Sequence, residues 1–209
     1  MNKLMSILIG IVILISISAI VLYSTPYQTE TKTIVDTGFS YYDIETIQKT
    51  LATKNIFVSA PTAITDHTIS QYCTFFDKGL PRTVEYCTTT AVTDVHGNSL
   101  GNINIGGDTN SPILAIANLE TSDLETNQDE ILAIIETMIE TLVCDCWEEE
   151  KSDDDVESIS AWVELVHKFY YDSSERGVKS KIDDLQNYEI TLEITPTDNS
   201  ILQTLVILK

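Results

Sequence analysis

Residues 100–119, LGNINIGGDTNSPILAIANL, decide the fold of this chain. Two runs rich in isoleucine, leucine and alanine flank Gly106–Asn110, whose glycine, aspartate and asparagine residues are typical of a turn. The sequence therefore predicts a strand at Leu100–Ile105, a turn, and a second strand at Ile113–Leu119. A turn this short brings the second strand back antiparallel to the first.

Further stretches with the same texture extend the predicted sheet in both directions. Threonine, valine, isoleucine and tyrosine dominate them, and turn residues separate them. We expect the sheet to be mostly antiparallel, because these strands follow one another through short turns. The additional predicted strands are Ile56–Val58, Thr68–Phe76, Thr83–Thr93, Tyr188–Thr195 and Ile201–Leu208, with a brief one at Thr33–Asp36.

Three segments carry the helical spacing of apolar residues instead. A short helix is predicted from Ser40 to about Asn55, and two longer ones from about Gln128 to Cys144 and from about Val156 to Tyr171. In the longer two, apolar residues recur every three or four positions along one stripe, which is typical of a helix that packs on a core. The predicted fold class is α+β: an N-terminal transmembrane helix followed by one domain with a mostly antiparallel sheet, a short N-terminal helix and two longer amphipathic helices.

The transmembrane helix is predicted from Leu4 to Leu22, where no charged residue occurs. A helix over this stretch is roughly 28 Å long, close to the thickness of the hydrocarbon layer of a bilayer. Lys3 before it and the acidic excess after it favour an N-terminus in the cytoplasm. Cleavage after Ser18, as in a signal peptide, is the alternative and would give a secreted protein. The expected parts are a signal anchor at 1–23, a linker at 24–32 and an acidic extracytoplasmic domain at 33–209.

The net charge of −20 at pH 7 limits the partners that this chain can bind. Its 32 acidic residues outnumber 12 basic ones, so phosphate backbones are repelled. We therefore expect no nucleic-acid partner. The expected partners are a membrane, through residues 4–22, and a protein outside the cell.

No catalytic or cofactor motif is apparent in the sequence. The Gly-x-Ser-x-Gly motif of serine hydrolases does not occur, and Gly106-Gly107 lacks the Gly-Lys-Ser/Thr that completes a phosphate-binding loop. The histidines, His67, His96 and His167, are scattered along the chain. The catalytic residues, if any, are therefore unknown, and we expect no cofactor.

Clustered acidic residues offer oxygen ligands for calcium. Asp108, Asn110 and the run Glu148–Asp155 carry such groups, but their spacing differs from that of an EF-hand loop. A solvated acidic surface accounts for them more simply. We expect only weak, salt-sensitive Ca²⁺ binding and assign no metal site.

Four cysteines carry the most information about sites. Cys73 and Cys87 lie on either side of a predicted hairpin turn centred on Leu80, which places them opposite each other and within reach of a cross-strand disulfide. Cys144 and Cys146 then remain as a pair. They are expected to form a small disulfide or a reducible pair able to take up a soft metal such as copper(I).

These observations favour a membrane-tethered, non-enzymatic domain outside the cytoplasm that binds a ligand or a protein partner. Two alternatives stay open. The first is a metal-handling protein that uses Cys144 and Cys146, and the second is an extracytoplasmic hydrolase whose catalytic residues follow no recognised motif.

Overall fold

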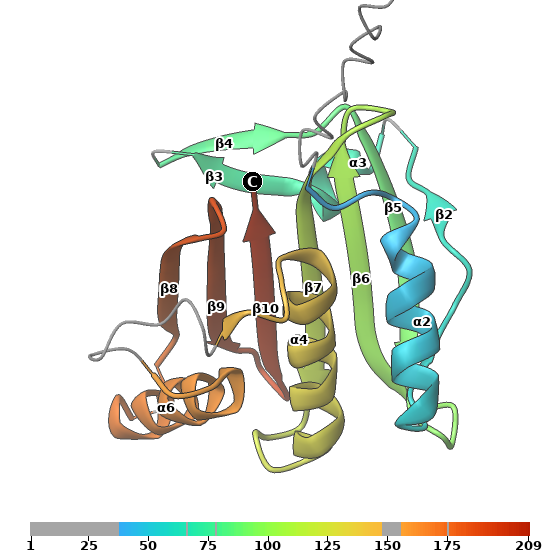
Figure 1. Cartoon of the computed structure of the whole chain (residues 1–209). Coiled ribbons are helices and arrows are strands. Elements are labelled where there is room, and N and C mark those ends of the chain that lie inside the picture. The colour runs from blue at the N-terminus through green and yellow to red at the C-terminus, as the bar shows by residue number, and fades with distance from the viewer. Residues whose placement is uncertain (1–37, 66, 78, 148–155, 175) are drawn as a thin grey trace, which may run out of the picture. The chain divides into compact units, whose positions relative to one another are not determined.

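The computed structural model describes residues 38–65, 67–77, 79–147, 156–174 and 176–209 (Figure 1). They belong to one compact unit, Thr37–Lys209, built on a large antiparallel sheet. The strands of this sheet lie in the order β1-β5-β6-β7-β10-β9-β8, and β2 also pairs with β5. Their bounds are β1 Phe57–Val58, β2 Thr62–Ala63, β5 Tyr86–Thr93, β6 Ser99–Gly107, β7 Pro112–Thr121, β8 Val178–Leu185, β9 Tyr188–Pro196 and β10 Ile201–Leu208.

Three helices cover one face of the sheet, which we call the helix face (Figure 1). They are α2 (Asp43–Thr53), α4 (Gln128–Leu142) and α6 (Ile159–Asp172). Alternate residues of each strand point to this face because side chains in a strand alternate between its two sides. Leu119, Leu192 and Leu205 are examples, and each is fully buried among the helices. The main hydrophobic core therefore lies between the sheet and these helices.

The opposite face of the sheet, which we call the open face, is only partly covered. A small lobe packs on one end of it and consists of α3 (Ile69–Tyr72) and the two-stranded sheet β3 (Thr74–Asp77) and β4 (Leu80–Thr83). The core beneath the lobe is small. Its buried members are Cys73, Val84, Cys87, Leu114 and Ile116.

The element order repeats within the domain. Helix α2 precedes β5, β6 and β7, and helix α6 precedes β8, β9 and β10. The two sets of three strands meet at β7 and β10, which pair antiparallel from Ile201 opposite Thr121 to Leu208 opposite Leu114. The lobe and the strands β1 and β2 lie between α2 and β5 in the chain, and nothing between α6 and β8 corresponds to them in the described residues.

One part of the predicted fold class is wrong. The structure is mostly antiparallel sheet with few helices, and within the described ranges none of the helices has the length and apolar character needed to cross a bilayer. The predicted transmembrane helix is therefore not supported. Its residues, 1–23, lie outside those that the structure describes, as do the linker at 24–32 and the strand at 33–36.

Two local predictions also need correction. Residues 69–72, expected within a strand, form α3, because the carbonyl of Thr65 accepts hydrogen bonds from the amides of Thr68 (2.9 Å) and Ile69 (3.1 Å) and starts a helical turn there. The edge strand β8 was not expected at all. Its sequence, VKSKIDDL, is mostly polar because the strand lies at the edge of the sheet and is covered on one face only.

Candidate functional site

A groove of about 960 Å³ opens between the first half of α2 and the edge of the sheet at β5. Its walls come from four segments that are distant in sequence. The lining residues used below are Tyr41, Tyr42, Glu45, Gln48, Lys49 and Tyr86. Ala60 and Pro61 line it from the segment that connects β1 to β2, Ala63 from β2 itself, and Thr109 and Asn110 from the β6–β7 turn.

The turn before α2 fixes the position of the groove's first wall. Asp43 accepts hydrogen bonds from the backbone amide of Ser40 (2.6 Å) and from its hydroxyl (3.2 Å). From there Tyr41, Glu45 and Gln48 follow at helical spacing, so they lie along one side of α2. Ile44 and Ile47 point to the core and hold this side in place.

Two tyrosines form one end of the groove. The rings of Tyr41 and Tyr86 meet edge to face, with centroids 5.2 Å apart. The Tyr41 hydroxyl donates a hydrogen bond of 2.7 Å to the backbone carbonyl of Asp108 in the β6–β7 turn. Burial, with smaller contributions from the nearby Tyr86 and Asp108, raises the pKa of Tyr41 to about 12. Tyr41 therefore stays protonated at neutral pH, where it acts as a positioning group and not as a base.

The opposite wall is tied to both α2 and the sheet. The side-chain amide of Gln48 donates to the carbonyl of Ser59 at 2.6 Å and to that of Val58 at 3.4 Å. Ser59 is in turn bonded to β5, where its amide donates to the carbonyl of Ala91 (2.9 Å) and its hydroxyl accepts from the Ala91 amide (2.9 Å). The groove is thus a preformed feature with fixed walls.

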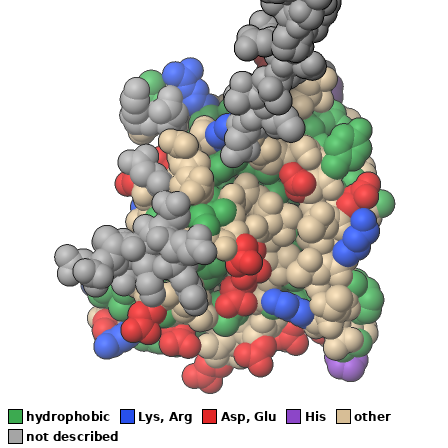
Figure 2. All heavy atoms as spheres, in the orientation of Figure 1, with side chains coloured by type: hydrophobic (Ala, Val, Ile, Leu, Met, Phe, Trp, Pro, Cys, Tyr) green, Lys and Arg blue, Asp and Glu red, His purple; other side chains and the backbone are tan. Residues whose placement is uncertain are grey.

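The charges of the groove cancel. Its lining includes one acidic residue, Glu45, and one basic residue, Lys49, and these form an exposed i, i+4 ion pair at 3.8 Å. Figure 2 shows that acidic side chains gather instead over α4 and α6, toward the lower part of the view. In a chain with a net charge of −20, the groove is therefore a nearly neutral region.

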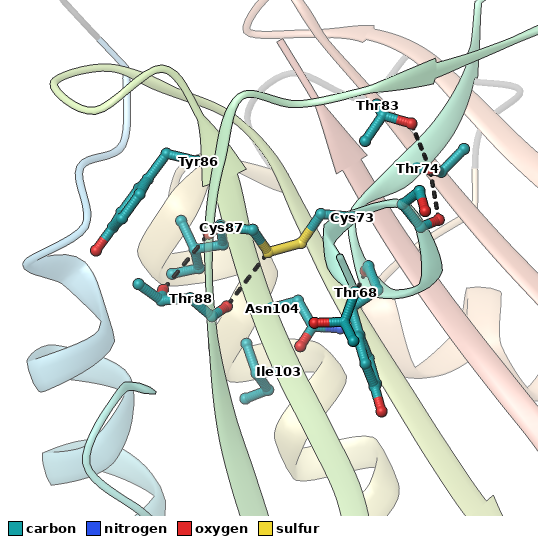
Figure 3. Close-up of a disulfide and its surroundings, with 12 residues drawn as sticks. Thr68, Cys73, Thr74, Thr83, Tyr86, Cys87, Thr88, Ile103 and Asn104 are labelled. Atoms are coloured by element: carbon teal, nitrogen blue, oxygen red, sulfur yellow. Dashed lines mark hydrogen bonds between the residues drawn. A yellow bond between two sulfur atoms is a disulfide. The ribbon is translucent and has the colours of Figure 1, made fainter. Parts of the chain in front are cut away.

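The structure places the four cysteines in two pairs at disulfide distance, which supports the expectation of disulfide bonds. Cys73, just after α3, is paired with Cys87 in β5, and their Cα atoms are 6.4 Å apart (Figure 3). Both side chains are fully buried. Cys144 and Cys146 form the second pair, with Cα atoms 5.1 Å apart, just beyond the end of α4.

The hairpin register from which we paired Cys73 with Cys87 is wrong. The strand β3 pairs with β4 so that Thr74 lies opposite Thr83, whereas Cys87 lies one strand further along the chain and opposite Gly106. The disulfide therefore joins the lobe to the main sheet and is not a link within one hairpin. The reason for the difference is that the strand predicted at Thr83–Thr93 is divided: β3 pairs with β4, which ends at Thr83, whereas Cys87 lies in the separate strand β5.

The other candidate residues do not gather into a site. Asp108 accepts hydrogen bonds from the amides of Asn110 and Ser111, both at 2.7 Å, which lower its pKa and define a turn. His67 and His96 are exposed, while His167 is buried and bonded to Gln203 at 2.9 Å. Within the described ranges, no three His, Cys, Asp or Glu side chains are grouped closely enough to hold a metal ion. The acidic run 148–155 lies outside those ranges.

Sequence reasoning did not single out the groove, because its walls come from separate segments and share no motif. The one available indication was the pair Tyr41-Tyr42 at a predicted helix start. Comparison of the chain with protein-family models, with curated proteins and with solved structures found no match in any of the three.

Proposed function

We propose that this chain is a non-enzymatic ligand-binding domain that works outside the cytoplasm and holds a neutral, polar ligand in the groove between α2 and β5. The observation that carries the proposal is the preformed groove itself. Ligand sites are typically concave, formed before binding, and lined by aromatic residues with a few polar groups. The tyrosines and the amides of Gln48 and Asn110 fit that description.

A neutral oligosaccharide suits the chemistry of this groove best. Tyr42 is 80% exposed, so its ring is free to pack against the apolar face of a sugar ring. The Asn110 amide can both donate and accept hydrogen bonds as sugar hydroxyls do. The side-chain oxygens of Gln48 and Thr88 can accept, since their donors are bonded to backbone carbonyls. A charged ligand would gain little, because Glu45 and Lys49 already neutralise each other.

A location outside the cytoplasm is supported by the paired cysteines. All four lie at disulfide distance from a partner, and disulfides persist in oxidising compartments but are rare in the cytosol. The acidic surface suits a secreted or surface-exposed domain, because a net charge far from zero keeps a protein soluble.

The test is a titration of the isotope-labelled domain with neutral oligosaccharides, followed by backbone amide NMR shifts. We expect the shifts to concentrate at residues 40–49, 58–63 and 109–110. Tyr42→Ala should weaken binding by about tenfold, equivalent to about 1.4 kcal/mol. Phe169→Ala is the matched control, since Phe169 is an exposed aromatic residue on α6, outside the groove.

Two results would contradict the proposal. One is that charged ligands, and not neutral ones, shift the groove amides. The other is that Phe169→Ala weakens binding as much as Tyr42→Ala does, which would place the ligand elsewhere. The native fold of each variant is checked by its circular dichroism spectrum, because Tyr42 and Phe169 are both exposed and neither supports the core.

A further inference from the structure

The two cysteine pairs lie in very different surroundings. Cys73 and Cys87 have no exposed surface and belong to the small core under the lobe. Cys144 and Cys146 are partly exposed where α4 ends, and Cys146 packs on the margin of the main core. A dissolved thiol can therefore reach the second pair without unfolding, and it cannot reach the first.

Cys144 faces a small cavity of about 230 Å³ whose charged lining residues are all acidic. Glu136, Glu140 and Cys144 follow at intervals of four residues, so they lie on one side of α4 and its extension. Asp145 completes the cavity's set of three carboxylates. Lys54 forms an ion pair with Glu136, with its ammonium nitrogen 3.9 Å from the carboxylate.

The carboxylates of this cavity interact electrostatically. The pKa of Glu140 is raised by burial first, and then by the charges of Asp145 and Glu136, while Lys54 lowers it in part. Among the described residues, three carboxylates against the ammonium group of Lys54 leave the surroundings of Cys144 negative. An approaching anion is repelled by this charge and an approaching cation is attracted.

The fold does not depend on the Cys144–Cys146 link. The two residues are separated by a single residue, so joining them removes little freedom from the unfolded chain. The adjoining segment is held independently, because the ring of Trp147 lies 6.0 Å from that of Trp162 and its indole nitrogen donates to the carbonyl of Val156 at 3.2 Å. The pair can therefore open and close while the domain remains folded.

We propose that Cys144–Cys146 is a thiol–disulfide exchange site that oxidises dithiols on neutral or basic partners, and that Glu136, Glu140 and Asp145 exclude anionic thiols. This proposal does not depend on the function proposed for the groove. It names the partner by chemistry: a peptide or small molecule with two thiols and no net negative charge beside them.

The exchange balances in two steps. A partner thiolate attacks Sγ of Cys144, forms a mixed disulfide, and breaks the Cys144–Cys146 bond, so Cys146 leaves as a thiolate and takes a proton from solvent. The partner's second thiolate then attacks the partner's first sulfur, which is bonded to Sγ of Cys144 in the mixed disulfide. This step forms the partner's disulfide and releases Cys144 as a thiolate, which takes a proton from solvent. Two electrons pass from the partner to the pair, and the partner gains a disulfide.

The test compares three small thiols of similar size and different charge on the intact domain. They are cysteamine (cationic), mercaptoethanol (neutral) and mercaptoethanesulfonate (anionic), compared at equal thiolate concentration. Alkylation and peptide mass mapping follow each cysteine pair, and tryptophan fluorescence follows Trp147, next to Cys146. We expect Cys144–Cys146 to react fastest with cysteamine and slowest with mercaptoethanesulfonate, by roughly tenfold or more at low salt. The difference in rate between the three thiols should disappear in about 1 M salt, where the Debye length is about 3 Å.

Variants of the acidic residues test whether their charge, and not merely the exposure of Cys144–Cys146, determines the different rates of the three thiols. Glu136→Gln combined with Glu140→Gln should reduce the spread between the three thiols, whereas Glu125→Gln, an exposed residue outside the cavity, should leave it unchanged. Equal rates for the three thiols, or an unchanged spread in the double variant, would overturn the selection. Reduction of Cys73–Cys87 before Cys144–Cys146 would overturn the assignment of the exchange site.

Discussion

The two faces of the sheet are stabilised in different ways. On the helix face, isoleucine and leucine side chains from the strands pack against three helices in a continuous core. On the open face, apolar contact is confined to the few residues under the lobe, and a row of polar side chains runs across the strands beside it. The helix face is stabilised by burial of apolar surface. On the open face, a disulfide and side-chain hydrogen bonds add to a smaller amount of apolar burial.

The polar row shows what replaces apolar packing on the open face. Asn102, Asn118, Thr204, Glu193 and Lys179 lie opposite one another on successive strands. The Asn102 side-chain oxygen accepts from the amides of both Asn104 (2.9 Å) and Asn118 (3.3 Å), and Asn118 accepts from the Thr204 hydroxyl (3.3 Å). Such bonds each contribute modestly, so this face depends more on its covalent link than the helix face does.

The largest expected effect is a truncation in the core of the helix face. Leu192→Ala removes a fully buried side chain from β9, and we expect the free energy of unfolding to fall by about 2 to 5 kcal/mol. The matched control is Leu202→Ala on the open face of β10, where the side chain is only partly buried and lies beside Thr195 and Glu120. Urea denaturation measures both variants. Equal losses would show that the two faces do not differ as we describe.

The second prediction concerns the two disulfides. Replacing Cys73 and Cys87 with alanine, which buries no polar group, should lower the free energy of unfolding by about 3 kcal/mol, because the link closes a loop of 14 residues. The corresponding replacement of Cys144 and Cys146 should cost about 1.5 kcal/mol on the same chain-entropy model. Hydrogen exchange should show faster exchange in the lobe, at 69–77, only in the first variant. Uniformly faster exchange across β9 and β10 would mean that the lobe supports the main sheet as well.

The third prediction is a pH dependence on the helix face. Burial lowers the pKa of His167 below its ordinary value of 6.5, although Gln203 and Glu164 oppose the shift. The folded state therefore favours the neutral ring, and the unfolded state binds more protons just below pH 6.5. The contribution of His167 to the free energy of unfolding is fully present above pH 6.5. It is lost as the pH falls through the folded pKa of His167, by at most about 1.4 kcal/mol per pH unit.

Urea denaturation at pH 7 and pH 5 measures this contribution from His167. His167→Gln should lose less stability over that interval than the native chain does, whereas His96→Gln, an exposed control in a turn, should behave like the native chain. If His167→Gln retains the full pH dependence, another group is responsible for it.

The smallest expected effects have opposite signs on the two faces. Asn102→Ala removes the acceptor of two hydrogen bonds on the open face and should cost about 1 kcal/mol. On the helix face, the buried hydroxyl of Thr137 has no hydrogen-bond partner in the described part of the chain. Thr137→Val keeps the shape and removes that hydroxyl, so it should be neutral or stabilising by up to about 1 kcal/mol. Thermal denaturation resolves the sign, and a destabilising Thr137→Val would mean that the hydroxyl is bonded after all.

The helix face was largely predictable from the sequence because its pattern is local. The apolar stripes of α4 and α6 follow the helical period, and the short, mostly apolar run Ile201–Leu208 gives β10 with the bounds expected. The open face was harder, because its covering lobe depends on a four-residue helix in a threonine-rich segment that also suits a strand. The edge strand β8 has no continuous apolar pattern, because one of its sides faces solvent and tolerates lysine and aspartate.

The candidate site was less predictable than the fold. Local sequence indicated a helix start near Tyr41, but no local pattern shows that the backbone of Ser59 bonds to both Gln48 and Ala91. A groove between distant segments is a property of tertiary packing. The cysteine pairs were easier to find, because four cysteines allow few pairings.

The position of β10 determines when during synthesis the domain can fold. It follows the other described strands in sequence, yet it lies inside the sheet between β7 and β9. Until residues 201–208 have been made, β8 and β9 have no strand through which to join β7, and the core cannot close. The central pairing of β7 with β10 joins residues that are far apart in the chain, such as Thr121 and Ile201, which predicts slow folding. A nascent chain without β10 would leave the backbone edges of β7 and β9 unpaired, so we expect it to be the form of this protein that chaperones bind and proteases degrade.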